Sequence, residues 1–127
     1  MDTLLLEVNW LAALIGAAVA FGVGWLWYSN LMFGERWRAG IGVRSADTSG
    51  QLLSMVVQGF ATVLLAWVIA VAETLDSLQF VVLLALTIGT FIKANGLFAQ
   101  KSKFAIGVDV GYLWIAVIIM VVAHGLL

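Results

Sequence analysis

Hydrophobic residues fill four long stretches of this chain, and most of its charged residues lie in the short segments between them. The stretches cover residues 8–29, 52–72, 79–97 and 104–126. Each stretch has close to the ~20 residues that an α-helix needs to cross a hydrocarbon layer about 30 Å thick. The pattern therefore predicts an all-α, polytopic membrane protein built as a four-helix transmembrane bundle.

The overall composition agrees with this pattern. Of the 127 residues, 64% are hydrophobic and 10% are charged, whereas a typical soluble domain is about 45–50% apolar and about 25% charged. Because the four stretches leave only short connections, we expect one membrane domain over residues 1–127 and no separate soluble domain. A net charge of -1 gives no reason to expect a nucleic-acid partner. The expected partner is the lipid bilayer.

Basic residues are unevenly distributed among the connecting segments. Five of the six basic residues lie in the loop 30–51 and in the connection before the fourth stretch, whereas the N-terminal segment and the other connection have none. The positive-inside rule therefore places loop 30–51 in the cytoplasm and both termini outside. Residues 31–38 mix large apolar groups with charges, which predicts a short helix along the inner membrane surface. The five basic residues are Arg36, Arg38, Arg44, Lys101 and Lys103.

Small residues recur at every fourth position of the first stretch. On a helix they would form one smooth ridge, and close backbone approach over small residues is a principal means of helix packing in lipid. We expect this ridge to pack inside the bundle, with a homodimer seam as the alternative. The ridge consists of Ala12, Gly16, Ala20 and Gly24, and Gly107 and Gly111 repeat the spacing once in the fourth stretch.

Aromatic residues mark both ends of the first stretch. Trp10 lies near its beginning, Trp25, Trp27 and Tyr28 lie at its end, and Trp37 follows in the loop. Tryptophan and tyrosine favour the headgroup layer, where an apolar ring and a polar tip are both accommodated. We interpret the five residues as interfacial anchors. A shelf that binds a lipid or a cofactor is the alternative.

Two ionisable residues, Lys93 and Asp109, fall inside the predicted spans. Lys93 lies eight residues before Lys101, near the turn of the predicted hairpin, and Asp109 lies eight residues after it. At about 1.5 Å per residue both would lie about 12 Å from the turn, which predicts an ion pair. The pair could serve as a proton or ion relay, bind a polar substrate, or fix the hairpin register. Alternatively, Lys93 reaches the headgroups while Asp109 accepts hydrogen bonds from Tyr112 or Asn95.

The candidate site at this level is therefore a polar cluster formed by Lys93, Asn95, Asp109 and Tyr112. His124, the single histidine, lies near the outer end of the fourth stretch, and we interpret it as an interfacial residue. The chain has no cysteine, and a metal site at His124 would need carboxylates such as Glu73 or Glu7. No phosphate-binding loop and no pair of carboxylates at catalytic spacing is visible. We therefore name no catalytic, cofactor-binding or metal-ligating residue, and enzyme activity is unsupported.

Several short motifs resemble those of a known family. The segments 9–12, 24–29 and 33–37 resemble the first-span signature of small bacterial integral-membrane proteins that are classed as a domain of unknown function. Their residues are Asn9-Trp10-Leu11-Ala12, Gly24-Trp25-Leu26-Trp27-Tyr28-Ser29, and Phe33-Gly34 with Trp37; Asn95-Gly96-Leu97-Phe98 and Gly111-Tyr112 resemble its second half. One departure is Asn30, where the family usually has proline. The resemblance implies four spans and a plasma-membrane location, and it brings no activity.

Two functions fit these observations. The favoured one is a non-transporting accessory or scaffold protein of the bacterial plasma membrane, which assembles with itself or with a larger membrane complex through its small-residue ridge. The alternative is a small transporter or channel, in which the polar cluster handles a proton, an ion or a small polar solute.

Overall fold

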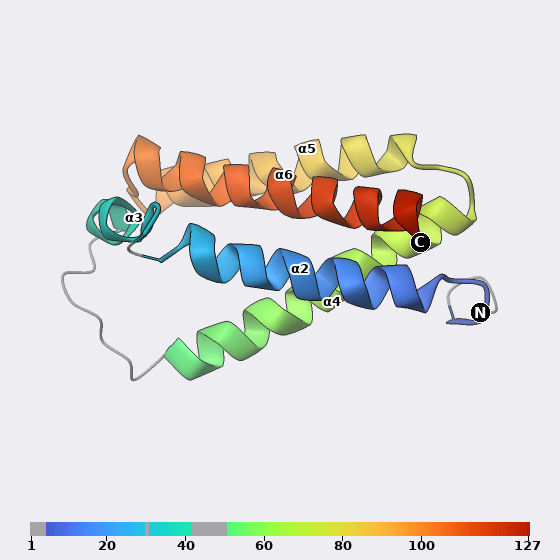
Figure 1. The fold of residues 1–127 in the computed structure, drawn as a ribbon. Helices are drawn as coiled ribbons and strands as arrows, with labels where there is room; N and C mark the ends of the chain where they lie inside the picture. Colours follow the sequence, from blue (N-terminus) through green and yellow to red (C-terminus); the bar gives the residue numbers. More distant parts are fainter. Residues whose placement is uncertain (1–4, 30, 42–50) are drawn as a thin grey trace.

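The structure is a computed structural model that describes residues 5–29, 31–41 and 51–127. The predicted loop 30–51 is therefore described only in part. Within the described ranges the chain forms long and short α-helices and no β-strand, which confirms the predicted fold class (Figure 1). The helices are α2 (Trp10–Trp27), α3 (Gly34–Ile41), α4 (Gln51–Thr74), α5 (Gln79–Phe98) and α6 (Lys103–Leu126).

The four long helices are long enough and apolar enough to cross a membrane. Their ends lie within two residues of the ends of the four hydrophobic stretches of the sequence. The short helix α3 overlaps residues 34–38 of the segment 31–38, for which the sequence predicts a surface helix. The chain is therefore a multi-pass membrane protein by the length and composition of its helices.

Local signals explain where α2 and α6 begin and where α4 and α5 end. The side chain of Asn9 accepts a hydrogen bond from the backbone N–H of Ala12 at 3.1 Å, and Ser102 does the same for Ala105 at 3.0 Å. Both are residue types that favour the N-cap position. After α4 and α5 the backbone reverses through Asp76 and Gln100, whose φ angles of 54° and 59° lie in the left-handed region.

Helix α6 lies at the centre of the arrangement, because it contacts α2, α3, α4 and α5. Successive long helices run in opposite directions, so both termini lie at one end of the molecule (Figure 1). Helix α3 lies across the opposite end, where it is seen nearly along its axis. This arrangement places α3 beside the first turns of α6.

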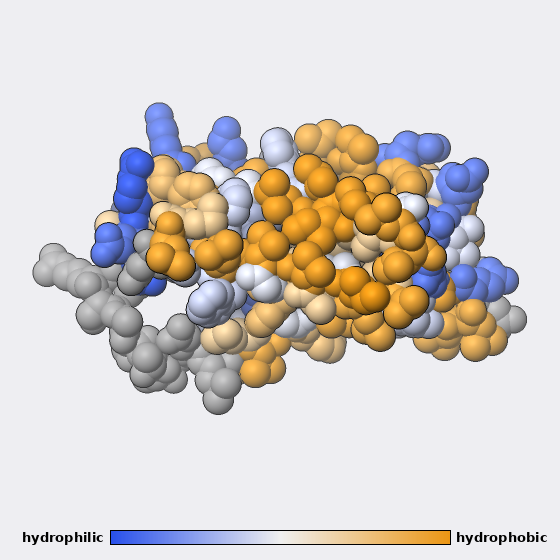
Figure 2. All heavy atoms as spheres, viewed as in Figure 1, coloured by the Kyte–Doolittle hydropathy of each residue, from blue (hydrophilic) through white to orange (hydrophobic). Residues whose placement is uncertain are grey.

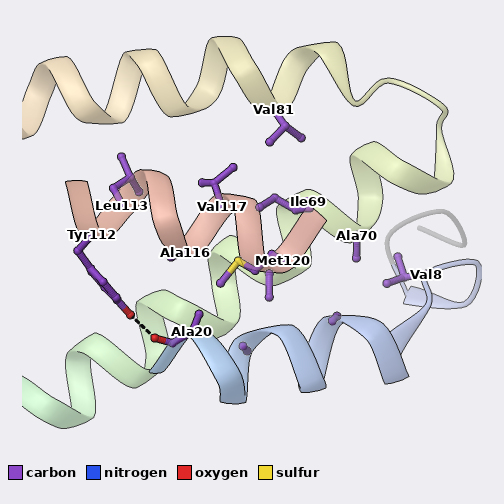
Figure 3. Packing of buried hydrophobic residues seen from close by; sticks show 13 residues of the cluster. Val8, Ala20, Ile69, Ala70, Val81, Tyr112, Leu113, Ala116, Val117 and Met120 are labelled. Atoms are coloured by element: carbon purple, nitrogen blue, oxygen red, sulfur yellow. Dashed lines mark hydrogen bonds between the residues drawn. The ribbon is translucent and has the colours of Figure 1, made fainter. Parts of the chain in front are cut away.

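The small-residue ridge of α2 lies inside the bundle, where Ala12, Gly16, Ala20 and Gly24 are all buried. A Cβ atom added to Gly16 would lie 3.3 Å from both the Met120 backbone and the Ala123 side chain. Small residues thus allow α2 and α6 to approach closely, and the ridge is occupied by this internal contact. Figure 3 shows the surrounding core, in which Ile69 and Met120 are fully buried.

The second small-residue pair does not form a common seam. Gly107 is exposed, and a Cβ atom added to it would meet no atom within 4 Å, whereas a Cβ on Gly111 would lie 3.3 Å from the Trp27 ring. The two glycines are four residues apart but contact different surroundings. Only Gly111 therefore takes part in packing against α2.

The surface agrees with a membrane environment. In Figure 2 hydrophilic residues gather at the two ends of the molecule and hydrophobic residues cover the middle. Exposed large hydrophobic side chains occur on every long helix, for example Leu14, Phe60 and Leu83. Such a continuous apolar surface is far larger than soluble monomers normally expose and suits contact with lipid.

Candidate functional site

The most elaborate polar arrangement in the described residues surrounds Asp109, in the second turn of α6. Its Oδ1 accepts hydrogen bonds from the Tyr28 hydroxyl at 2.7 Å and from the Trp37 indole N–H at 2.9 Å. Its Oδ2 lies 3.8 Å from Nζ of Lys101, and the Asp109 side chain is only 16% exposed. We call Asp109, Tyr28, Trp37 and Lys101 the Asp109 cluster. Both carboxylate oxygens are therefore engaged by positively polarised groups.

Two residues of the first half of the chain, Tyr28 and Trp37, reach Asp109 because a tight turn follows α2. Tyr28 follows the last residue of α2, and the backbone N–H groups of Phe33 and Gly34 donate to the carbonyls of Trp27 at 3.2 Å and Ser29 at 2.9 Å. A Cβ on Gly34 would collide with the carbonyl oxygen of Tyr28. Glycine at this position therefore allows α3 to fold back and bring Trp37 to the carboxylate.

Aromatic rings enclose the carboxylate. The Tyr28 ring packs edge-on against Trp37 at 4.8 Å and against Tyr112 at 5.7 Å between ring centroids. The Tyr112 hydroxyl donates to the Ala20 carbonyl at 2.7 Å, as drawn in Figure 3. The Trp27 indole donates to the Val108 carbonyl at 3.0 Å. The polar tips thus bond within the protein, and their hydrogen bonds are stronger than in water to the extent that they are buried.

Helix α3 is also attached to the start of α6 away from the carboxylate. The backbone N–H of Ser102 donates to the Gly40 carbonyl at 2.8 Å. The Arg36 guanidinium lies 3.9 Å from the centroid of the Phe104 ring, and Phe33 packs on the same ring at 6.1 Å. A cation over an aromatic face is attractive. The cluster and these contacts together fix α3 across the end of the bundle.

The structure corrects the expected pairing of Lys93 with Asp109. Asp109 pairs with Lys101, and no described residue lies within ion-pair distance of Lys93. Lys93 and Asp109 have similar depth along the hairpin, but they lie on different sides of it. Asp109 faces α2 and α3, whereas Lys93 lines a groove between α5 and α6. Similar depth alone does not place two side chains on facing sides of their helices.

The expected hydrogen-bond donors to Asp109 are corrected as well. Tyr112 donates to Ala20 rather than to Asp109, and the Asn95 side chain belongs to an exposed position of α5. The residues that bond to the carboxylate are Tyr28 and Trp37, and from the sequence both were interpreted as interfacial anchors. The signal that could have found them is the motif resemblance, because Tyr28 of its Trp-Tyr-Ser motif and Trp37 of its Phe-Gly-x-x-Trp motif both bond to Asp109.

The five aromatic residues interpreted as interfacial anchors separate into three groups. Trp25 is 66% exposed and points away from the bundle. At the opposite end, Trp10 is partly buried, donates to the Leu5 carbonyl at 2.8 Å and packs on Trp67 at 5.7 Å. Trp27, Tyr28 and Trp37 direct their polar atoms into the bundle, so these three residues hold helices together.

His124 is buried inside the bundle, because its side chain is only 1% exposed. Its Nδ1 lies 3.8 Å from Oε2 of Glu73 on α4, and neither ring nitrogen has a hydrogen-bond partner. Among the described residues, no group of three or more His, Cys, Asp or Glu side chains could hold a metal ion. His124 is therefore a second buried polar group, at the end of the bundle opposite to Asp109.

Comparison with known proteins identifies the family of the chain. The DUF1761 family, described as a protein of unknown function, matches residues 11–125. The chain belongs to this family. The DUF1761 match includes the whole Asp109 cluster, and its description names no activity. No curated protein and no solved structure matches the chain.

Proposed function

We propose that this DUF1761 protein is a non-transporting accessory or scaffold protein of the bacterial plasma membrane, which acts by assembling with itself or with another membrane protein. The positive-inside distribution of the basic residues and the resemblance of its motifs support this location. In this proposal α3 forms a fixed cytoplasmic face of the bundle. A fixed face favours recognition by a partner, because little conformational freedom remains to be lost on binding.

The closed state of the Asp109 cluster carries the proposal. Carboxylates that relay protons or ions through a membrane face a water-filled cavity or a chain of further ionisable groups. Here Oδ1 accepts two hydrogen bonds, from Tyr28 and Trp37, and Oδ2 faces Lys101. A carboxylate with these partners stabilises the contact between α2, α3 and α6.

The interior between the two buried polar sites also favours this function over transport. Asp109 and His124 are separated by fifteen residues of α6, or about 22 Å along the axis. The buried α6 side chains between them are Tyr112, Leu113, Ala116, Val117 and Met120. The buried hydroxyl of Thr62 on α4 donates to the Gln58 carbonyl of its own helix at 2.7 Å. The described core therefore has no continuous chain of polar groups along which a proton or ion could pass from Asp109 to His124.

Reconstitution into liposomes tests this proposal against the transport alternative. We expect proton, sodium and potassium flux to stay at the level of protein-free liposomes for both the wild type and Asp109→Asn. We also expect light scattering of the purified protein in mild detergent to give a mass above that of one chain. A wild-type flux that Asp109→Asn abolishes would establish the transporter function, and a monomeric mass without any membrane partner would remove the assembly.

Two variants of Asp109 measure whether the cluster stabilises the contact between α2, α3 and α6. Asp109→Asn removes the ion pair with the partly exposed Lys101 and turns two charge-assisted hydrogen bonds into neutral ones, so we expect a loss of about 1–2 kcal/mol. Asp109→Leu leaves the Tyr28 and Trp37 donors without an acceptor, and we expect a larger loss of about 3 kcal/mol. Thermal unfolding in detergent checks this order. Two variants as stable as the wild type would contradict this stabilising role.

A further inference from the structure

A groove between α5 and α6 lies on the side of the hairpin that faces away from Asp109. Its volume is about 550 Å³. It is lined mainly by apolar side chains, and it has open space at Gly107, where a Cβ would meet no atom within 4 Å. The Thr90 hydroxyl on its wall donates to the Leu86 carbonyl of its own helix at 2.7 Å. The groove thus offers an apolar channel whose wall hydroxyl is already satisfied.

Two lysines give this groove a charge. Lys93 and Lys103 both line it, both are exposed, and no described acidic residue lies within ion-pair distance of either. Lys101, between them in sequence, differs because it faces Asp109 at 3.8 Å. Lys93 lies five residues before the end of α5, or about 7.5 Å, so its flexible stem can bring the ammonium group toward the headgroup layer.

The far part of the groove lies deeper along the helices. Trp114 is eleven residues after Lys103 on α6, or about 16 Å along the axis. Its indole N–H lies 3.4 Å from the Ala85 carbonyl, so its ring closes the apolar wall beside Gly89. The groove therefore has positive charge toward the end occupied by α3 and an apolar surface that continues toward the middle of the span.

We propose that the α5–α6 groove binds one anionic phospholipid of the leaflet next to α3, with its phosphate at Lys93 and Lys103 and an acyl chain along Gly107 toward Trp114. Basic pockets between transmembrane helices on the cytoplasmic side suit anionic headgroups. A second copy of the chain fits less well, because the one acidic residue that its long helices carry at this end, Asp109, already faces Lys101, so two lysine charges would be buried without a free partner on those helices. A phosphate supplies that charge, and an acyl chain fills the apolar part.

Native mass spectrometry of the full-length protein in mild detergent tests this proposal with phosphatidylglycerol and phosphatidylcholine of identical acyl chains. We expect one phosphatidylglycerol to bind about tenfold or more tightly than phosphatidylcholine. Lys93→Gln and Lys103→Gln should each weaken phosphatidylglycerol about five-fold, as expected for one surface lysine. Arg38→Gln, which removes one positive charge from a residue that does not line the groove, is the matched control and should leave this binding unchanged.

A second pair of variants tests the shape of the groove without changing its charge. Gly107→Leu fills the open space above Gly107 and should abolish the preferential binding. Gly22→Leu places the same side chain at another glycine with no atom within 4 Å of its Cβ, and it should have no effect. Equal binding of the two lipids, or phosphatidylglycerol binding unaffected by the lysine and Gly107 variants, would overturn the proposal. Loss of a dimer in Gly107→Leu, without loss of lipid, would assign the groove to a second copy instead.

Discussion

Single residues set how closely the helices of this protein approach. Gly24 lies opposite the Tyr112 ring, and a Cβ there would lie 2.6 Å from the Tyr112 hydroxyl oxygen and 2.7 Å from the ring carbon that carries it. Tyr112 cannot move freely, because its hydroxyl bonds to the Ala20 carbonyl and its ring packs against Tyr28. One methyl group at Gly24 would therefore disturb the contact between α2 and α6 and the packing beside the Asp109 cluster.

We expect Gly24→Ala to destabilise the protein by about 2 kcal/mol, because it overfills a packed contact and displaces a hydrogen-bonded ring. Gly22→Ala is the matched control in the same helix, since a Cβ at Gly22 meets no atom within 4 Å. This control should be neutral or slightly stabilising, because alanine favours helix more than glycine does. Unfolding in detergent measures both, and equal stabilities would contradict the packing at Gly24.

The residue scale is also where the sequence predicted least about the site. Counting residues from the hairpin turn gave Lys93 and Asp109 a common depth, but an α-helix turns about 100° per residue, so depth does not determine direction. The direction of Asp109 depends on α2 and α3, which are far from it in sequence. In the sequence alone Tyr28 and Trp37 likewise resemble interfacial residues, because only the folded structure shows that they bond to Asp109.

At the scale of elements, α3 is the part whose position depends most on specific contacts. It has eight residues, too few for a stable helix in isolation. Its attachment rests on the Trp37 bond to Asp109, the Arg36 contact with Phe104 and the approach of Gly40 to α6. A Cβ on Gly40 would collide with the Ser102 hydroxyl and lie 2.8 Å from the Ala105 side chain. The fit at Gly40 therefore controls whether α3 can rest on the bundle.

We expect Gly40→Val to detach α3 and to speed tryptic cleavage after Arg36 and Arg38 about tenfold, since proteolysis requires local opening of the helix. Ala39→Val is the matched control, because Ala39 is exposed and the substitution adds the same branched side chain to the same helix. Cleavage rates of the two variants in detergent, followed by mass spectrometry of the fragments, check this. Similar rates would show that α3 does not depend on its contact with α6.

The elements themselves follow closely from the sequence, unlike their contacts. Long apolar runs are local signals, and they predicted the four long helices. The caps that Asn9 and Ser102 form in the structure act within a few residues as well, although the apolar runs alone do not reveal them. The mixed segment 31–38 indicated a surface helix, and α3 covers Gly34–Ile41. No local sequence pattern predicts that α3 packs on α6. That docking joins groups such as Trp37 and Asp109, which are 72 residues apart.

At the scale of the whole molecule, the distribution of charged residues distinguishes the same two ends that the fold does. The end with α3 and the turn between α5 and α6 carries Arg36, Arg38, Lys101 and Lys103. The opposite end carries both termini and the turn between α4 and α5, where Asp76 lies. Basic residues in short loops favour the cytoplasmic side. The assignment of α3 as a cytoplasmic face and of the lipid groove to the inner leaflet both depend on this orientation.

Single-cysteine labelling tests the orientation without background, because the chain has no cysteine of its own. Glu35, Ala99 and Asp76 are exposed positions, the first two at the α3 end and the third at the opposite end. A membrane-impermeant maleimide should label Asp76→Cys in intact bacterial cells, and Glu35→Cys and Ala99→Cys only after lysis. Labelling of Glu35 and Asp76 from the same side would be incompatible with four spans. The reverse pattern would keep the spans but invert the protein, and it would move the α5–α6 groove, with its two lysines, to the outer leaflet.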